Sequence, residues 1–193
     1  MECYERRLSN HNFLIFNLYS RQSDCFLWSE SISGRGANEI SSCLLKYISD
    51  ADVRVVEVID FFCDATACQN KNSTFLRKAS SVKRMTIFYF ETNHGQSAGD
   101  SVRSVIERAL GRVTNLYVPS QLPTLIRLAC NRSPYNTTDL SPNDMMDYCQ
   151  LSKDLGILRA REAHDGSTLM WPSIKQVRVE SDELTEFQFK PCS

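Results

Sequence analysis

The chain has 193 residues, of which 42% are hydrophobic and 23% are charged, and its formal net charge is −1. This size and composition are typical of a soluble globular protein with a substantial core. They exclude the basic excess of proteins that bind nucleic acid over much of their surface, so any contact with DNA is expected from a local patch.

The cysteines and the first residues of the chain bear on its compartment. The eight cysteines are scattered and none forms a C-x-x-C pair, which argues against a zinc finger. The opening MECYERRLSNHN lacks the apolar region of a signal peptide. No apolar run reaches the roughly 18 residues of a membrane helix. We therefore expect a nuclear or cytoplasmic protein with reduced thiols and no membrane contact.

The first fifty residues predict a hairpin and a helix. Residues 12–19 (NFLIFNLY) and 24–29 (DCFLWS) are apolar and aromatic, and SRQS lies between them. This pattern favours a β-hairpin with a four-residue loop. Apolar residues then recur at helical spacing, namely Ile40, Cys43, Leu44, Tyr47 and Ile48.

Two β-branched and aromatic runs follow, at residues 53–62 and 84–90. The first shows little alternation, which predicts a strand buried on both faces within a central sheet. Residues 70–81 predict a short helix and a loop. A basic cluster lies in and after this segment, and it is either a phosphate contact or a solvated face; its members are Lys71, Arg77, Lys78, Lys83 and Arg84.

The next helix is predicted from its first turn. Ser97 is followed by Asp100 at capping-box spacing. A buried stripe follows at Val102, Val105, Ile106, Ala109 and Leu110.

The last third of the chain predicts two helices and a strand pair. Residues 119–132 begin through a proline, and residues 141–155 begin with Ser-Pro. Residues 169–179 and 184–190 predict strands. The elements together predict a single α/β domain over residues 1–193, with a mixed central sheet and flanking helices.

Three acidic residues stand where such a fold places chemistry. Asp64 follows the first central run, and Asp100 and Glu107 lie on one flank of the helix after the second. Carboxylates from separate elements hold the Mg²⁺ or Mn²⁺ ions of two-metal phosphoryl transfer, and α/β sheets place function at strand ends. The alternative is structural: Asp64 caps a turn, Asp100 caps the helix, and Glu107 is solvated.

Polar residues beside these acids are candidate substrate contacts. Gln69, Asn70, Lys71 and Asn72 form a dense polar run, which either positions a phosphate or simply forms a loop. His94 is a candidate metal ligand or general base, and its alternative role is to hold a loop by hydrogen bonds.

Three strings resemble signatures of one protein family. Residues 62–72 (FCDATACQNKN) resemble a D-N-C-G-G-Q-N-K-N signature, and residues 92–109 (TNHGQSAGDSVRSVIERA) resemble a second signature in which an Asp precedes a helix reading I-E-R. Residues 28–48 resemble its W-x-E-x-x-x-x-R-G-x-x-E-I-x-S-C-L segment. The family is a widespread group of transposon-derived metazoan proteins.

The resemblance implies a fold and an activity. Members of the family carry an uncharacterised domain that looks like a DDE-type transposase core of ribonuclease H-like fold. Such a core cleaves and transfers DNA strands with divalent metal ions. Asp64 matches the Asp that opens the first signature, and Asp100 and Glu107 match the Asp and the helix Glu of the second. DNA is the partner that the resemblance implies.

The chain departs from the family pattern at several positions. Ala65, Thr66 and Ala67 stand at or near the asparagine and glycines of the first signature, and Arg103 replaces a histidine of the second. The first catalytic Asp of such a core lies on a strand before the segment that matches Tyr4 to Leu8. We therefore expect this chain, truncated at that end, to be weak or inactive as a metal-dependent nuclease.

Two further hypotheses stay open at this point. One is a non-catalytic module that keeps the fold and binds nucleic acid or protein. The other is a working nuclease in which Asp24, Glu30 or Asp60 replaces the first acid. Asp60 is the weakest of these, because four residues along a strand place it about 13 Å from Asp64.

Overall fold

The computed structural model describes residues 9–50, 56–64, 82–90, 97–113, 118–154, 166–168, 170, 173–180 and 188–191. The chain divides into two compact units, each built from two separate segments. The first unit contains Met1–Arg35 and Gln96–Met145, and the second contains Gly36–Gly95 and Met146–Ser193. The single domain expected over residues 1–193 stays a prediction.

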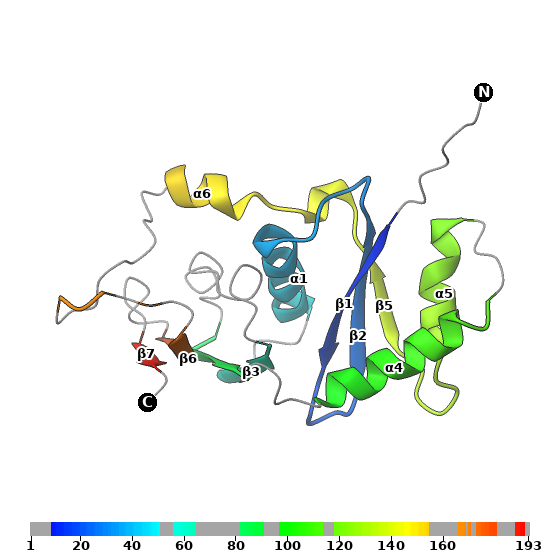
Figure 1. Cartoon of the computed structure of the whole chain (residues 1–193), viewed down its shortest axis with the longest axis horizontal. Helices are drawn as coiled ribbons and strands as arrows, with labels where there is room; N and C mark the ends of the chain where they lie inside the picture. The colour runs from blue at the N-terminus through cyan, green and yellow to red at the C-terminus, as the bar shows by residue number, and fades with distance from the viewer. Residues whose placement is uncertain are drawn as a thin grey trace. The chain divides into compact units, whose positions relative to one another are not determined.

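The first unit contains a three-stranded mixed sheet in the order β1-β2-β5 (Figure 1). Strand β1 (Asn10–Phe16) is antiparallel to β2 (Ser23–Ser29), and β2 is parallel to β5 (Asn136–Asp139). The expected hairpin is therefore confirmed.

The turn of this hairpin lies earlier than SRQS. Asn17 N–H donates to the Gln22 carbonyl at 2.9 Å, which leaves 18–21 as the loop. Asn17 Oδ1 accepts from the backbone N–H groups of Tyr19 and Ser20, both at 3.0 Å. Arg21 then turns the chain back with a φ of 58°. An asparagine that bonds the backbone two residues on is a turn former.

Two helices pack against this sheet. Helix α4 (Ala98–Leu110) lies along β1, and α5 (Leu122–Arg127), entered through the 3₁₀ turn η1 (Pro119–Gln121), lies along β5. The prediction of helices at both places is confirmed, although α5 ends five residues before Arg132. The buried residues of this core come from both helices and the sheet: Cys25, Leu27, Val102, Ile106, Leu122, Ile126 and Tyr135.

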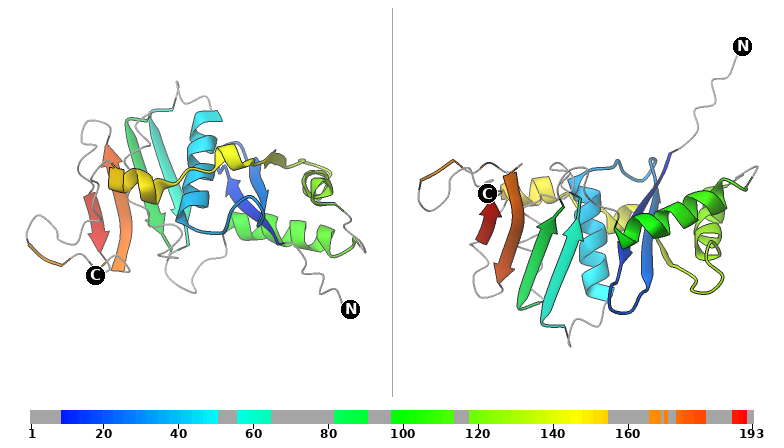
Figure 2. Two further views of the ribbon diagram at one scale, coloured as in Figure 1. Left: turned by 90° about the horizontal axis from the view of Figure 1, so that it is seen from above. Right: turned by 60° about the horizontal axis from the view of Figure 1, so that its bottom comes forward.

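The second unit contains a four-stranded mixed sheet in the order β3-β4-β6-β7 (Figure 2). Strand β3 (Val58–Cys63) is parallel to β4 (Arg84–Tyr89), whereas β6 (Ile174–Glu180) is antiparallel to both β4 and β7 (Gln188–Pro191). The predicted terminal strand pair is confirmed. Mixed α/β structure is likewise confirmed, but the described strands form two sheets where one central sheet was expected.

Helix α1 (Ala37–Asp50) provides the helical side of the second core. Its Ile48 is buried with the inward side chains of β4 and β6, and Leu44, Leu45 and Tyr47 pack around them. The amphipathic pattern predicted this stripe. The buried members of the cluster are Ile48, Val82, Met85, Ile87, Tyr89, Ile174, Val177 and Val179.

Two sequence predictions about single elements are wrong. Strand β3 is not buried on both faces, because its burial alternates residue by residue and leaves Val58, Asp60 and Phe62 exposed. The helix expected over 141–155 is two pieces: the 3₁₀ turn η2 (Pro142–Asp144) and helix α6 (Tyr148–Asp154). The break has a local cause, since Asp147 caps α6 by accepting from Gln150 N–H at 2.9 Å.

The described residues also bear on thiols and membranes. Among the described residues, Cys25, Cys43 and Cys130 are free thiols. None of the described helices has the length and apolar character needed to cross a bilayer.

Candidate functional site

The three candidate acids lie on two elements. Asp64 directly follows β3, and the Phe90 N–H donates to the Cys63 carbonyl at 2.9 Å, which fixes the end of β3 to the end of β4. Asp64 is exposed. It belongs to the second unit, whereas Asp100 and Glu107 lie on α4 in the first.

Asp100 completes the N-terminal cap of α4. Its Oδ2 accepts from Ser97 N–H at 2.8 Å and from Ser97 Oγ at 3.0 Å, and Asp100 N–H donates to Ser97 Oγ at 3.2 Å. The bonds from the Ser97 backbone and hydroxyl hold the pKa of this carboxyl below its usual value, with a smaller contribution from Arg103. The carboxylate is thus already used to begin the helix.

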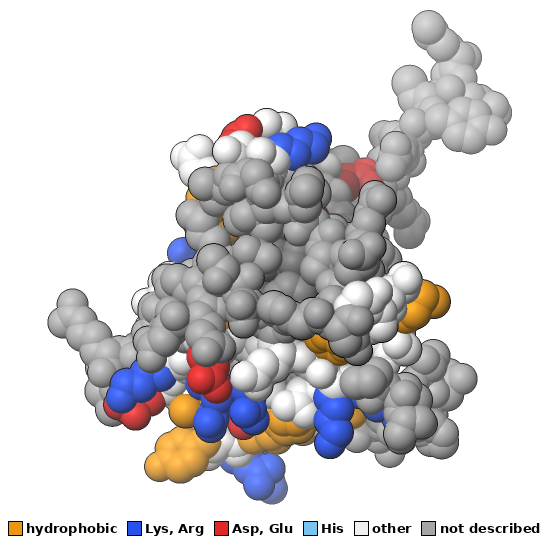
Figure 3. Space-filling view, turned by 90° about the vertical axis from the view of Figure 1, so that its left-hand side faces the viewer, with side chains coloured by type: hydrophobic (Ala, Val, Ile, Leu, Met, Phe, Trp, Pro, Cys, Tyr) orange, Lys and Arg blue, Asp and Glu red, His pale blue; other side chains and the backbone are white. Residues whose placement is uncertain are grey.

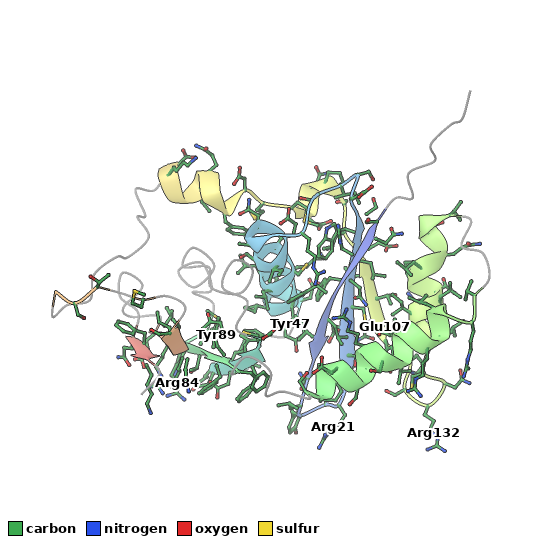
Figure 4. All side chains as sticks on the ribbon, in the orientation of Figure 1. Arg21, Tyr47, Arg84, Tyr89, Glu107 and Arg132 are labelled. Atoms are coloured by element: carbon green, nitrogen blue, oxygen red, sulfur yellow. The ribbon has the colours of Figure 1, made fainter. Side chains whose placement is uncertain are left out.

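Glu107 has a cationic partner on the same helix face. Arg103 Nε lies 2.9 Å from Glu107 Oε1, with side-chain exposures of 68% and 62% (Figure 4 labels Glu107). An exposed i, i+4 pair of this kind stabilises a helix by about 0.3–0.5 kcal/mol. The ion pair between Arg103 and Glu107 is weak enough that a metal ion of useful affinity would displace Arg103. The pair therefore neutralises Glu107 but still permits metal binding.

Asp100 and Glu107 do not share an ion position in this arrangement. Seven residues separate their Cα atoms by roughly 10 Å along the helix axis, and an ion holds its oxygen ligands at about 2.0–2.6 Å. Over the part of the chain that the structure describes, no three His, Cys, Asp or Glu side chains group closely enough to hold a metal.

The predicted substrate contacts all lie outside the described residues; they are Gln69, Asn70, Lys71, Asn72 and His94.

The three replacement acids occupy other positions. Asp24 Oδ1 accepts from Asn136 Nδ2 at 2.9 Å, so this acid joins β2 to β5. Glu30 follows β2 in the first unit, and Asp60 lies exposed on β3. Neither Asp24 nor Glu30 belongs to the unit that contains Asp64.

A second candidate surface was expected from the sequence only in part, through Arg84 of the basic cluster. Register and alternation place one set of side chains on the face of the β3-β4-β6-β7 sheet opposite the α1 core. In Figure 4, Arg84 lies on this face, whereas Tyr89 lies on the side of α1. We call it the aromatic face, and its members are Val58, Asp60, Phe62, Arg84, Thr86, Phe88, Phe90, Gln176, Arg178, Glu180, Gln188 and Lys190.

Three phenylalanines form the centre of the aromatic face. The Phe62 ring stacks on Phe88 with centroids 4.9 Å apart and planes 11° apart, and it lies 6.3 Å from Phe90. Phe62 is 51% exposed and Val58 is 42% exposed. The signal in the sequence was the i, i+2 spacing of Phe88 and Phe90, but it could be interpreted only once β3 was known to be half exposed.

Comparison of the chain with protein-family models, with curated proteins and with solved structures found no match.

Proposed function

We propose that this chain is a transposase-derived, ribonuclease H-like domain that does not cleave DNA by itself and acts by binding. Its ancestral activity is metal-dependent strand cleavage and transfer. The order of elements supports this descent: a parallel strand pair ends at Asp64, and the following helix carries Asp100 and Glu107. This is the order of acid, strand and helix that the sequence signatures imply.

The hydrogen bonds of Asp100 carry the non-cleaving part of the proposal. In a working site, Asp64 with Asp100 or Glu107 would hold ions that activate water and stabilise the leaving oxygen. Here Asp100 instead holds Ser97, and Glu107 holds Arg103. Releasing the cap would cost about 1 kcal/mol, which is small beside the roughly 8 kcal/mol of a micromolar site. The ion-free chain therefore stabilises α4 with both acids, and releasing the cap would lower the affinity for an ion by roughly fivefold.

A metal titration tests this proposal. Mn²⁺ is titrated by calorimetry into the chain and into Asp64→Asn and Asp100→Asn, and Mg²⁺-dependent cleavage of a DNA substrate is measured in parallel. Asp154→Asn is the matched control, because Asp154 is an exposed acid bonded within a helix, to Gln150.

We expect the unmodified chain to bind Mn²⁺ no more tightly than millimolar. We also expect it to cleave DNA no faster than the three variants do. The proposal would be contradicted if Mn²⁺ binding and DNA cleavage were both lost in Asp64→Asn and both kept in Asp154→Asn. That result would establish an active nuclease.

A further inference from the structure

We propose that the aromatic face binds single-stranded nucleic acid, with bases stacking on the phenylalanines and phosphates contacting Arg84 and Arg178. This inference goes beyond the proposed function, because it uses neither Asp64 nor the acids of α4. It also agrees with the net charge of −1, because a chain without a basic excess is expected to bind nucleic acid only at a local patch.

The aromatic component is preformed, with Phe62 exposed and Phe88 and Phe90 half-buried. Phe62 stacks on both Phe88 and Phe90 at the end of the β3-β4 pair, and half of the Phe62 surface is open to solvent. A base can stack on such a ring whatever its identity, which is why sequence-tolerant binders of single strands use aromatic side chains. Figure 3 shows hydrophobic side chains beside Lys or Arg side chains in the lower part of that view.

The basic component lies beside the rings. Phe88 is opposite Gln176 in the register, so Arg178 is its diagonal neighbour, at the roughly 7–8 Å spacing of such pairs. This separation places a guanidinium beside a stacked base, where the phosphate of the same or the next nucleotide would lie. Arg84 lies further along β4 on the same face.

Within the described residues, neither arginine has an ion-pair partner. The Nε atoms of Arg84 and Arg178 are also buried and have no hydrogen-bond partner in this part of the chain. A buried donor without a partner is costly. Glu180 stands opposite Arg84 in the register, and a phosphate at the outer nitrogens can still bind either arginine, since arginine matches phosphate with two parallel hydrogen bonds.

Two acids on the same face set the strength of binding. Asp60 and Glu180 oppose Arg84, Arg178 and Lys190, so the face has an excess of one positive charge. This small excess favours weak binding that falls with salt. It also predicts that removing an acid strengthens binding, an effect that damage to the fold does not produce.

Fluorescence anisotropy tests the inference with labelled single-stranded DNA, RNA of the same sequence and duplex DNA at low salt. Phe62→Ala is expected to weaken single-strand binding at least fivefold, the lower end of the effect of losing one stacked base. Arg178→Gln is expected to weaken it and to reduce the slope of log K against log salt by about 0.7. Asp60→Asn is expected to strengthen it.

The matched controls lie in the first unit. Tyr19→Ala removes an aromatic ring that is 97% exposed, and Arg132→Gln removes an exposed arginine; both are expected to bind like the unmodified chain. Equal binding of RNA and DNA, or a preference for either, supports the proposal, and the preference identifies the physiological strand.

Three results would overturn the proposal. The first is no single-strand binding by the unmodified chain, and the second is tighter binding of duplex than of single strands. The third is that the chain self-associates, that Phe62→Ala converts it to a monomer, and that Asp60→Asn does not change its affinity for nucleic acid. This third result would identify the face as a protein interface. Each is independent of the metal titration, so failure of one proposal leaves the other standing.

Discussion

Ser97 and Asp100 bond each other reciprocally across the first turn of α4. The carboxylate accepts from the serine backbone at 2.8 Å and from its hydroxyl at 3.0 Å, and the serine hydroxyl accepts from Asp100 N–H at 3.2 Å. Both partners are needed for the motif, because each satisfies an N–H group that the helix leaves without an intrahelical acceptor. An acid predicted as a metal ligand is thus a structural element of the helix.

The first prediction concerns this cap. Asp100→Ala is expected to lower the free energy of unfolding by about 1 kcal/mol, and Ser97→Ala by a similar amount. Because the two residues form one motif, the double variant should cost less than the sum of the single variants. Urea denaturation of the four proteins measures this, and strict additivity would show that the reciprocal bonds do not form in solution.

The second prediction is the pH dependence of the same carboxylate. Its hydrogen bonds from Ser97 depress the pKa of Asp100 from its usual 3.8. A depressed acid stabilises the folded state above the unfolded-state pKa and loses this contribution as pH falls through the folded-state pKa. The stability difference between the unmodified chain and Asp100→Asn should therefore be constant at neutral pH and shrink below about pH 4. Thermal denaturation of both proteins across this range measures it, and a difference that grows on acidification would contradict the assignment.

The third prediction separates Glu107 from Asp100. Glu107→Gln should cost only about 0.3–0.5 kcal/mol, because the Arg103–Glu107 pair is exposed and screened by water. The loss should nearly vanish at 1 M salt, where the Debye length is about 3 Å. Denaturation at low and high salt measures both values, with Arg103→Gln as the matched variant from the other side of the pair. A loss above 1 kcal/mol that persists in salt would indicate a role beyond this pair.

The fourth prediction concerns two buried thiols. Burial raises the pKa of Cys25 and of Cys43 from about 9 to about 12. Between these values the unfolded chain releases protons that the folded chain keeps, so stability is complete below pH 9 and falls as pH rises through 12.

Cys25 lies in the first unit and Cys43 in the second. Substituting either cysteine should remove its part of the stability that the chain loses at alkaline pH. Cys25→Ala and Cys43→Ala are compared with the unmodified chain by denaturation at pH 7 and pH 10.5. The exposed fraction of the thiols is followed with a thiol reagent, and rapid reaction of both at pH 7 would contradict their burial.

Local signals predicted the elements that local interactions form. The capping box of α4, the hairpin of β1 and β2, and the apolar stripe of α1 are each specified by residues within a few positions of one another. The break before α6 had a local signal as well, Asp147 three residues before Gln150, but the stronger Ser-Pro start at Ser141 concealed it. The break also depends on a distant residue, because Ser42 Oγ accepts from Met146 N–H at 3.0 Å.

The candidate sites show the same limit. The position of Asp64 at a strand end followed from the sequence, since hydrophobic runs mark where strands stop. The aromatic face did not, because it requires the register of β3, β4 and β6, which are brought together from distant segments. The error over β3 has a similar cause: whether a second layer covers the other face of a strand is decided by distant segments that its own residues do not reveal.

The parallel pairing of β2 with β5 has a consequence for how the protein is made. Asp24 and its partner Asn136 are 112 residues apart, and at 5–20 residues per second a ribosome needs about 6–22 s to produce that interval. During this time the outer edge of β2 lacks its partner, while the first segment of the second unit and the helices α4 and α5 are being synthesised. The nascent chain therefore exposes an aromatic, apolar strand edge, which is a site for chaperone capture or aggregation. Truncation before β5 would make that exposure permanent.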